Sequence, residues 1–314
     1  MKKTNTAIFQ IDPLEKLNHK TDSSIFLIKE ALKSGVDVWI SSSSSLTFFD
    51  KQAFVYAYRI LDLDLSISQP MRVSIKDFMF FFIRQDPPFD INYLTNCYIL
   101  ELHQRNNKSP FFINNPSAIK NFTEKIFPFY FQDLTPRTYL TSNPIEFKKI
   151  LKKFKIAVIK KLYNKGGEDV YKVSLDDSKS LDTFKKCSSN FSEALIVQEY
   201  MDEVIFGDKR IILVDGIPQG AVNRVPRRGE FKANLHLGAK ADRTELTSKE
   251  KQICNSLENT LKKNKLFLVG IDVINEKLTE INVTSPTGLV QISRLEKKNL
   301  ATIIWKKLFK KFFP

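Results

Sequence analysis

The N-terminal part of the chain alternates short apolar runs with an amphipathic segment. The runs Ala7–Ile11 and Val36–Ile40 predict two buried strands. Between them, Ile25–Lys33 predicts a helix with an N-cap signal at Asp22-Ser23-Ser24 and with Gly35 just after its end. This β-α-β order predicts a parallel sheet, and such sheets bind ligands at the carboxyl ends of their strands.

The same pattern continues to about residue 115. Phe78–Ile83 predicts another buried strand, and the loop Arg84–Asp90 follows it because two prolines there stop both strand and helix. A helix over Tyr93–Gln104 and a short strand over Phe111–Asn114 come next. The turn residues Asn115-Pro116-Ser117 then predict a domain boundary.

After residue 119 the helices and strands become shorter and mixed. Helices are predicted over Asn121–Tyr130, Ile145–Phe154 and Ser248–Lys263, the last with a capping-box signal at Thr247–Glu250. The predicted strands are Ile156–Lys160, Ala194–Gln198 and Lys209–Val214. The C-terminal segment Asn299–Phe313 predicts a basic amphipathic helix.

One segment, Gly270–Val283, reads as two strands joined by a tight turn. With a three-residue loop over Asn275–Lys277, Asp272 would pair with Glu280, and both would share a face with Asn282. The opposite face would carry the apolar residues Ile271, Val273, Ile281 and Val283. Oxygen ligands of this kind suit magnesium. The alternative is a solvated polar face, but the segment places no lysine or arginine there to neutralise the acids.

A second segment suggests phosphate binding. Lys160 ends a predicted buried strand, and Gly166 and Gly167 follow in a loop whose backbone N–H groups would approach phosphate oxygens. A plain Gly-Gly turn between strands is the alternative. Taken alone, Lys125 fits a surface lysine of the predicted helix Asn121–Tyr130.

Composition and charge narrow the class of protein. The chain has 314 residues, 42% of them hydrophobic and 27% charged, which suffices for two or three packed units. The net charge of +14 suits a nucleotide substrate as well as a nucleic acid, and no nucleic-acid motif accompanies it. No apolar run approaches the ~20 residues of a membrane span, and no signal peptide follows the first lysines. We therefore expect a cytoplasmic protein.

These segments occur in the order in which bacterial glutathione synthetases carry them. The loop Arg84-Gln85-Asp86-Pro87-Pro88-Phe89-Asp90 is similar to that family's Arg-Lys-Asp-Pro-Pro-Phe-Asp, and Asn121–Phe127 resembles its Asn-x-x-Glu-Lys-Leu-x segment. Asp133–Thr138 and Gly207–Arg210 also match in order, and Thr279–Thr287 is nearly identical to the family's sequence. The chain thus resembles bacterial glutathione synthetases, of the ATP-grasp superfamily, over almost its whole length.

The resemblance implies an α/β and α+β fold. A Rossmann-like substrate and dimerisation domain would take residues 1–118, and a two-lobed ATP-grasp domain would take residues 119–314, with lobes of about 119–200 and 201–314. The implied reaction joins γ-glutamylcysteine to glycine through an acyl phosphate and releases ADP and phosphate. A homo-oligomer, dimer or tetramer, and no nucleic-acid or membrane partner are also implied.

The resemblance further assigns a role to individual residues. The nucleotide would be bound by Lys125, Lys160, Gly166, Gly167, Gln198, Glu199, Tyr200, Met201 and Asp208. Arg210 and Arg224 would be catalytic and steady the transferred phosphoryl group. Mg²⁺, with Mn²⁺ as the alternative, would be held by Asp272, Glu280 and Asn282. The amino-acid and peptide substrates would meet Arg84, Asn234, Ser285, Pro286 and Thr287. The loop Pro226–Gly238 would exclude water.

Several positions depart from the family pattern. The phosphate loop, usually Gly-Met-Gly-Gly, reads Asn164-Lys165-Gly166-Gly167. Lys232 replaces an arginine, and Leu289-Val290-Gln291 replaces Ile-Arg-Glu. Because arginine and lysine differ in carboxylate binding, a paralogous ligase with another peptide or amino-acid substrate is the alternative. For the C-terminal helix, docking on the protein body and binding to a membrane surface are both open.

Overall fold

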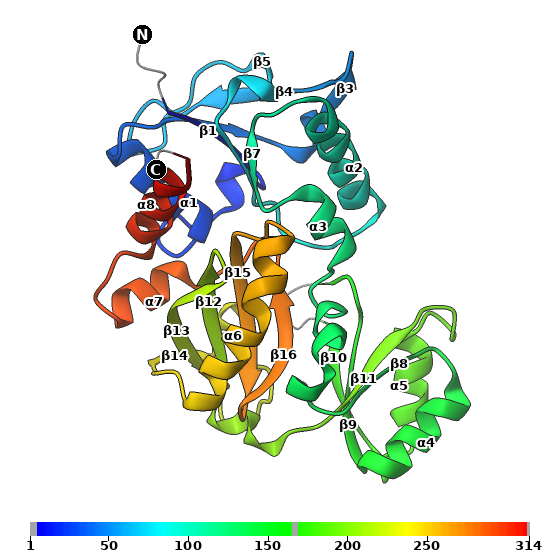
Figure 1. The fold of residues 1–314 in the computed structure, drawn as a ribbon. Coiled ribbons are helices and arrows are strands. Elements are labelled where there is room, and N and C mark those ends of the chain that lie inside the picture. The colour runs from blue at the N-terminus through cyan, green and yellow to red at the C-terminus, as the bar shows by residue number, and fades with distance from the viewer. Residues whose placement is uncertain (1–4, 165–168, 313–314) are drawn as a thin grey trace.

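The computed structural model describes residues 5–164 and 169–312 and contains three sheets in these ranges (Figure 1). The N-terminal sheet has the strand order β3-β4-β2-β1-β6-β7, with β5 paired to β4. Its strands are β1 (Thr6–Gln10), β2 (Asp37–Ser41), β3 (Thr47–Phe49), β4 (Gln52–Arg59), β5 (Met71–Ser74), β6 (Phe80–Ile83) and β7 (Phe111–Ile113). Strands β2, β1, β6 and β7 run parallel, which confirms the predicted parallel sheet.

Helices α1 (Ser23–Lys33), α2 (Ile91–Asn106) and α3 (Pro116–Asn121) accompany this sheet. The predicted N-cap of α1 is present, because the Asp22 carboxylate accepts hydrogen bonds from the backbone N–H groups of Ser24 and Ile25 at 2.7 and 2.9 Å. This cap fixes the loop at the carboxyl end of β1.

The C-terminal helix α8 (Leu300–Phe312) returns to the N-terminal sheet and lies beside α1 (Figure 1). Trp305 is buried at its centre, packs against Phe80 and Phe82, and donates its indole N–H to the Leu27 carbonyl at 3.0 Å. The apolar face is therefore covered by the protein body, as the docking interpretation predicted, and is not free for a membrane surface. No described helix combines the length and apolarity needed to cross a bilayer.

The middle sheet has the strand order β10-β9-β11-β8. Its strands are β8 (Thr138–Thr141), β9 (Ile156–Lys160), β10 (Val170–Ser174) and β11 (Leu195–Glu199), and it packs against α4 (Pro144–Phe154) and α5 (Ser180–Cys187). Phe147 of α4 and Phe184 of α5 stack with ring centroids 4.1 Å apart. The predicted strands Ile156–Lys160 and Ala194–Gln198 are confirmed to within a residue.

The C-terminal sheet has the strand order β14-β13-β12-β15-β16. Its strands are β12 (Asp208–Val214), β13 (Ile217–Val225), β14 (Lys240–Arg243), β15 (Leu268–Ile274) and β16 (Lys277–Asn282), and α6 (Ser248–Lys263) covers one face. The predicted capping box of α6 is present between Thr247 and Glu250. Helix α7 (Leu289–Leu295) leads on to α8. Short 3₁₀ helices span Leu14–Lys16, Ser43–Ser45, Ile75–Asp77, Phe127–Leu134, Asp202–Phe206 and Leu235–Leu237.

The prediction of a helix over Asn121–Tyr130 is wrong. Helix α3 ends at Asn121, and a 3₁₀ helix begins only at Phe127. Pro128 explains the difference, because a proline inside an α-helix clashes with the carbonyl four residues earlier, here that of Glu124. That carbonyl instead accepts a hydrogen bond from the backbone N–H of Ile281 at 3.1 Å. The segment between the two helices is thus tied to β16.

Candidate active site

A cavity of about 620 Å³ is bounded by the middle sheet, the C-terminal sheet and loops of the N-terminal sheet. Most of the site residues predicted from the sequence line it together. They are Lys125, Lys160, Gln198, Glu199, Tyr200, Met201, Asp208, Arg210, Arg224, Asn234, Asp272, Glu280, Asn282, Ser285 and Thr287. Gly166 and Gly167 lie outside the described residues. The cavity is in the size range of small-molecule sites.

The turn of the β15–β16 hairpin has two residues, Asn275 and Glu276, both with positive φ of 45° and 59°. The predicted three-residue loop is therefore wrong. A β-bulge between Asp272 and Val273 compensates for the missing loop residue, and Asp272 still pairs with Glu280. The bulge restores the register that the sequence pattern predicted.

This register gives the hairpin one polar and one apolar face. Asp272, Glu280 and Asn282 line the cavity, while the opposite side packs into the core formed with α6. The buried apolar residues of that core include Ile271, Val273, Leu278, Ile281 and Val283. The predicted separation of the two faces is confirmed.

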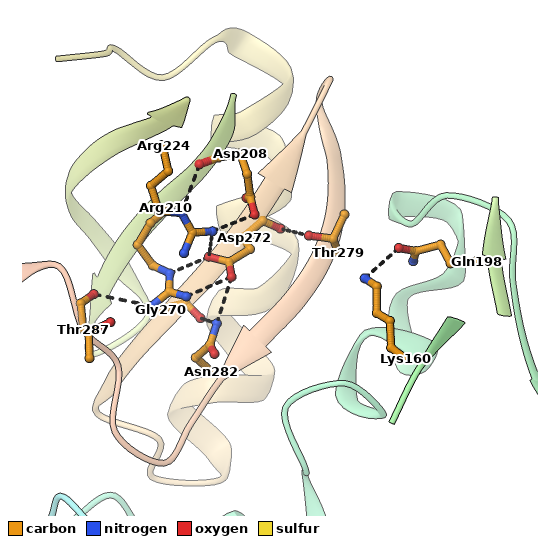
Figure 2. Close-up of polar contacts among 10 residues, drawn as sticks. All are labelled: Lys160, Gln198, Asp208, Arg210, Arg224, Gly270, Asp272, Thr279, Asn282 and Thr287. Carbon is orange, nitrogen blue, oxygen red and sulfur yellow. Dashed lines mark hydrogen bonds and ion pairs between the residues drawn. The ribbon is translucent and has the colours of Figure 1, made fainter. Parts of the chain in front are cut away.

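Asp272 is the centre of a buried ion-pair network (Figure 2). Arg210 binds its carboxylate with two nitrogens, Nε to Oδ1 and Nη2 to Oδ2, the latter at 2.9 Å. Arg224 contacts Asp272 Oδ1 at 3.0 Å and Asp208 Oδ2 at 2.8 Å. Arg210 comes from β12, next to β15, and Arg224 comes from β13, one strand further on, so the expectation that no arginine neutralises these acids is wrong. Hairpin periodicity alone does not show what a neighbouring strand contributes.

The two acids of this network differ in their pKa. Burial alone would raise the pKa of Asp272, but Arg210 and Arg224 overcome it and hold that pKa well below its usual range. Burial raises the pKa of Asp208 to about 6, since Arg224 offsets only part of that effect and the Asp272 charge adds to it. Asp208 Oδ1 is also buried without a hydrogen bond from the described residues. This oxygen is therefore available to a hydrogen-bond donor that enters the cavity.

The donor set at the hairpin fits a divalent cation in part. Glu280 forms an ion pair with Lys125 at 3.6 Å, and Asn282 uses its Nδ2 toward Gly270 O and Asp272 Oδ2 at 3.3 and 3.4 Å, which leaves its Oδ1 for a ligand. Asp272 is committed to the arginines. The described residues hold no cluster of three or more His, Cys, Asp or Glu side chains arranged for a metal. Glu280 and Asn282 are thus the freer oxygen donors, and they suit Mg²⁺ better than a soft metal.

Lys160 extends from β9 opposite the arginine network (Figure 2). Its Nζ donates to Gln198 Oε1 at 2.9 Å, and Gln198 Nε2 donates in turn to Thr138 Oγ1 at 2.9 Å. Burial lowers the pKa of Lys160. The lysine is thus held in place by β11, and no carboxylate of the described residues forms an ion pair with it, as suits an anion-binding group.

Lys125 lies inside the cavity wall, and its interpretation as a surface helix lysine is wrong. It is 8% exposed, and its Nζ bonds the Asn164 carbonyl and lies 3.6 Å from Glu280 Oε1. The break at Pro128 turns this segment toward β16. Lys125 and Lys160 therefore reach the cavity from two separate elements.

The strand end Gln198–Met201 borders the cavity on the side of the middle sheet. Glu199 is paired with Arg137 through two nitrogens, of which Nε lies 2.8 Å from Oε2, and this contact lowers the pKa of Glu199. Tyr200 lies under the Lys172 ammonium, 3.7 Å from the ring centroid. The side chain of Glu199 is occupied by Arg137, and the backbone N–H groups of Glu199 and Tyr200 donate to the carbonyls of Arg137 and Ile156. A ligand would therefore have to use the other backbone groups of this segment.

On the substrate side, Ser285, Thr287 and Asn234 line the cavity, while Arg84 and Pro286 stand behind it among the described residues. Arg84 is buried and donates to Ser24 Oγ at 3.1 Å and to the Pro286 carbonyl at 3.0 Å. It therefore joins the N-terminal sheet to the loop after β16. Its Nη1 is buried without a hydrogen bond among the described residues, so the direct substrate contact that the resemblance implies stays a prediction.

The loop Pro226–Gly238 also borders the cavity, through Phe231, Lys232, Ala233 and Leu235 as well as Asn234. Arg227 at its base donates to the Gly238 carbonyl at 3.2 Å, and a Cβ on Gly238 would overlap the Arg227 guanidinium. Gly238 also has a φ of 90°, a backbone conformation that favours glycine.

Glu124 is a site residue that the sequence reasoning missed. Its carboxylate lines the cavity and accepts a hydrogen bond from Thr284 Oγ1. Burial, together with the Glu280 charge, raises its pKa to about 7. Its position directly before Lys125 could have indicated a site residue, but the helix predicted for this segment gave Glu124 no role.

Comparisons with known proteins agree with this geometry. The family model "Prokaryotic glutathione synthetase, N-terminal domain" matches residues 6–120, and "Prokaryotic glutathione synthetase, ATP-grasp domain" matches residues 124–297. Glutathione synthetase of Mesorhizobium japonicum is 35% identical over 304 residues, which cover 94% of this chain and 95% of that protein. The glutathione synthetase of Agrobacterium fabrum is 34% identical, with 99% and 98% covered.

Solved structures show the same fold at low identity. D-cycloserine synthetase DcsG superposes with a TM-score of 0.68 at 11% identity, covering 96% of this chain and 99% of that one. D-alanyl-alanine synthetase A from Vibrio cholerae gives a TM-score of 0.59 at 14% identity, with 95% of each chain covered. The chain therefore has the ATP-grasp fold and belongs to the prokaryotic glutathione synthetase family.

Proposed function

We propose that the protein is a glutathione synthetase, which joins the cysteinyl carboxylate of γ-glutamylcysteine to the amine of glycine and converts ATP to ADP and phosphate. The observation that carries the proposal is the cavity itself. It brings lysines beside the middle sheet opposite arginines and acids of the C-terminal sheet. That distribution suits an ATP phosphate chain between two groups of cations, in a family whose members are named for this reaction.

The nucleotide would lie between the two sheets. The backbone of Glu199–Met201 would read the adenine, and the unpartnered Oδ1 of Asp208 would accept from a ribose hydroxyl. Lys125 and Lys160 would bind the phosphates as point charges. Glu280 and Asn282 would hold Mg²⁺ or Mn²⁺, which when bound supplies positive charge for the phosphates. Asp272, the third predicted ligand, would take part only if it released one of its contacts with Arg210 and Arg224.

The first step forms a bond between a carboxylate oxygen of γ-glutamylcysteine and the γ-phosphorus, and ADP leaves. Arg210 and Arg224 would stabilise the charge on the transferred phosphoryl oxygens, because Asp272 already holds both guanidinium groups in place. In the second step the glycine nitrogen, after losing a proton, attacks the acyl carbon, and phosphate leaves with the electrons of the broken C–O bond. The loop Pro226–Gly238 would keep water from the acyl phosphate.

A second candidate is a paralogous ligase that uses another peptide or amino acid. Lys232, which lines the cavity where the family pattern has an arginine, favours it, as does Val290 in place of a second arginine of that pattern. Arginine binds a carboxylate through two parallel hydrogen bonds, and lysine cannot reproduce that geometry. On the ATP-binding side the residues assigned to the metal match the family pattern, and the departure lies at Asn164-Lys165 of the phosphate loop.

A phosphate-release assay separates the two candidates. With ATP, Mg²⁺, γ-glutamylcysteine and glycine, phosphate release is expected together with a tripeptide of the mass of glutathione. Glu280→Gln should abolish release, while Glu146→Gln, at an exposed position on α4, should not. Release only with a different amine acceptor or donor peptide would establish the paralogue. Release with none of them would exclude both ligase reactions.

We further propose a cytoplasmic location and a homo-oligomer, dimer or tetramer, without nucleic-acid or membrane partners. A cytoplasmic location would supply the ATP that the proposed reaction consumes. Sedimentation at several protein concentrations tests the oligomer, and a single species with the 36.3 kDa mass of one chain would contradict it.

A further inference from the structure

Gln291 on α7 lines the cavity and has a buried side-chain oxygen. Its Oε1 accepts no hydrogen bond from the described residues. Helix α7 is held against the N-terminal loops, because the Leu289 N–H donates to Ser23 Oγ at 3.3 Å and Arg294 donates to the Lys20 carbonyl at 3.0 Å. The position of Gln291 is thus fixed at the end of the cavity that faces the N-terminal sheet.

An unmet buried acceptor is costly in the free protein. Leaving such a group unpaired costs roughly 1–3 kcal/mol, and nearly all buried polar groups in proteins have a partner. The described neighbours of Gln291 on α7, Val290 and Ile292, are buried apolar side chains. A leucine at this position would keep the apolar packing without the unmet oxygen, so the amide points to a hydrogen-bond donor that a ligand brings into the cavity.

The charged groups at this end of the cavity indicate which donor that is. The N-terminal loops contribute two carboxylates, Asp22 and Asp86, and one cation, Lys16, to the described lining. Asp22 adjoins Ser23, which holds the start of α7. Although Asp22 Oδ1 caps α1, its other oxygen and the Asp86 carboxylate place negative charge suited to an ammonium beside one cation suited to a carboxylate. An α-amino-acid end carries that pair of charges.

Resting on the function proposed above, we infer that Gln291 Oε1 accepts a hydrogen bond from the α-ammonium group of the γ-glutamyl residue of the donor peptide. The glycine ammonium is the wrong candidate, because it must lose a proton and attack the acyl carbon beside Arg210 and Arg224. The γ-glutamyl end is the part of the peptide remote from the reacting carboxylate. Gln291 is then a specificity residue for a free α-amino group.

The test compares three variants with two peptides in steady-state kinetics. Gln291→Leu should raise the KM for γ-glutamylcysteine about 10-fold to 100-fold, the effect of losing a hydrogen bond to a charged group, and leave the KM for ATP and glycine unchanged. Gln291→Glu keeps an acceptor oxygen and should stay within a few-fold of the wild type. Gln252→Leu, at an exposed position on α6, is the matched control and should change nothing.

Glutarylcysteine, which lacks only the α-amino group, isolates the contact. The wild type should bind it more weakly than γ-glutamylcysteine, and Gln291→Leu should bind it as the wild type does. A larger KM for glycine, an equal loss with both peptides, or a loss in Gln291→Glu as great as in Gln291→Leu would overturn the inference. Lack of wild-type turnover with γ-glutamylcysteine and glycine would instead refute the proposed function, and the inference would fall with it.

Discussion

The β15–β16 hairpin and the segment 121–134 supply charged groups to one cavity in different ways. In the hairpin, strand alternation places Asp272, Glu280 and Asn282 on one face, so a local pattern contains the site. In the segment 121–134 no regular element presents Glu124, which is held by a backbone hydrogen bond from the distant residue Ile281. The difference shows that a site residue can be predicted when its own element orients it, and not when a remote strand does.

The two regions also differ in electrostatics. Asp272 pairs across the sheet with Arg210, and this contact helps to lower its pKa. Glu124 has the Thr284 hydroxyl as its hydrogen-bond donor, and burial raises its pKa to about 7. Burial acts in the same direction on both carboxylates, so access to an arginine decides the outcome.

Replacing Arg210 by methionine should have the largest effect on stability. The change leaves Asp272 buried with one arginine fewer, and breaking a buried pair in this way typically costs ~3–5 kcal/mol. Urea unfolding monitored by tryptophan fluorescence and by circular dichroism measures the free energy of unfolding. Arg59→Met is the matched control, because Arg59 pairs with Asp37 at 2.7 Å but is 53% exposed, and it should cost less than ~1 kcal/mol. Equal losses of unfolding free energy in the two variants would show that the network around Asp272 stabilises the protein no more than an exposed ion pair does.

Most of the fold could be predicted because its signals are local. The Asp22 cap, the capping box at Thr247–Glu250 and the parallel β-α-β unit each depend on residues close in sequence. The register of the hairpin was also predicted, although the predicted loop was one residue too long. The bulge between Asp272 and Val273 cancelled that error.

What could not be predicted depends on contacts between distant residues. Arg210 and Arg224 reach Asp272 only because β12 pairs with both β13 and β15, and no spacing within the hairpin indicates that order. The amphipathic pattern of α8 is visible in the sequence, but the packing of Trp305 on the N-terminal sheet is not. The helix predicted around Lys125 failed because Pro128 outweighs helix periodicity.

Replacing Lys125 by methionine tests the segment 121–134 directly. If the break in the helix brings this lysine to the phosphates, kcat/KM for ATP should fall about 100-fold, equivalent to about 2.7 kcal/mol. The coupled phosphate-release assay measures it. Lys149→Met on α4, whose lysine is 67% exposed, serves as the control and should retain activity. Similar activity in the two variants would mean that Lys125 only supports the cavity wall.

Glu124→Gln should have the smallest effect, and it should depend on pH. The folded pKa of Glu124 is about 7, above the ordinary 4.5, so its contribution to stability is present below pH 4.5 and is lost as the pH rises toward 7. The free energy of unfolding of the variant relative to the wild type should therefore rise by about 1–2 kcal/mol between pH 4.5 and pH 8, since water in the cavity screens part of the burial cost. Urea unfolding without nucleotide or metal measures this difference. Glu146→Gln, at an exposed position, should give no such rise. If the difference in unfolding free energy between Glu124→Gln and the wild type did not change with pH, burial would not raise the pKa of Glu124, and the contrast with Asp272 would be lost.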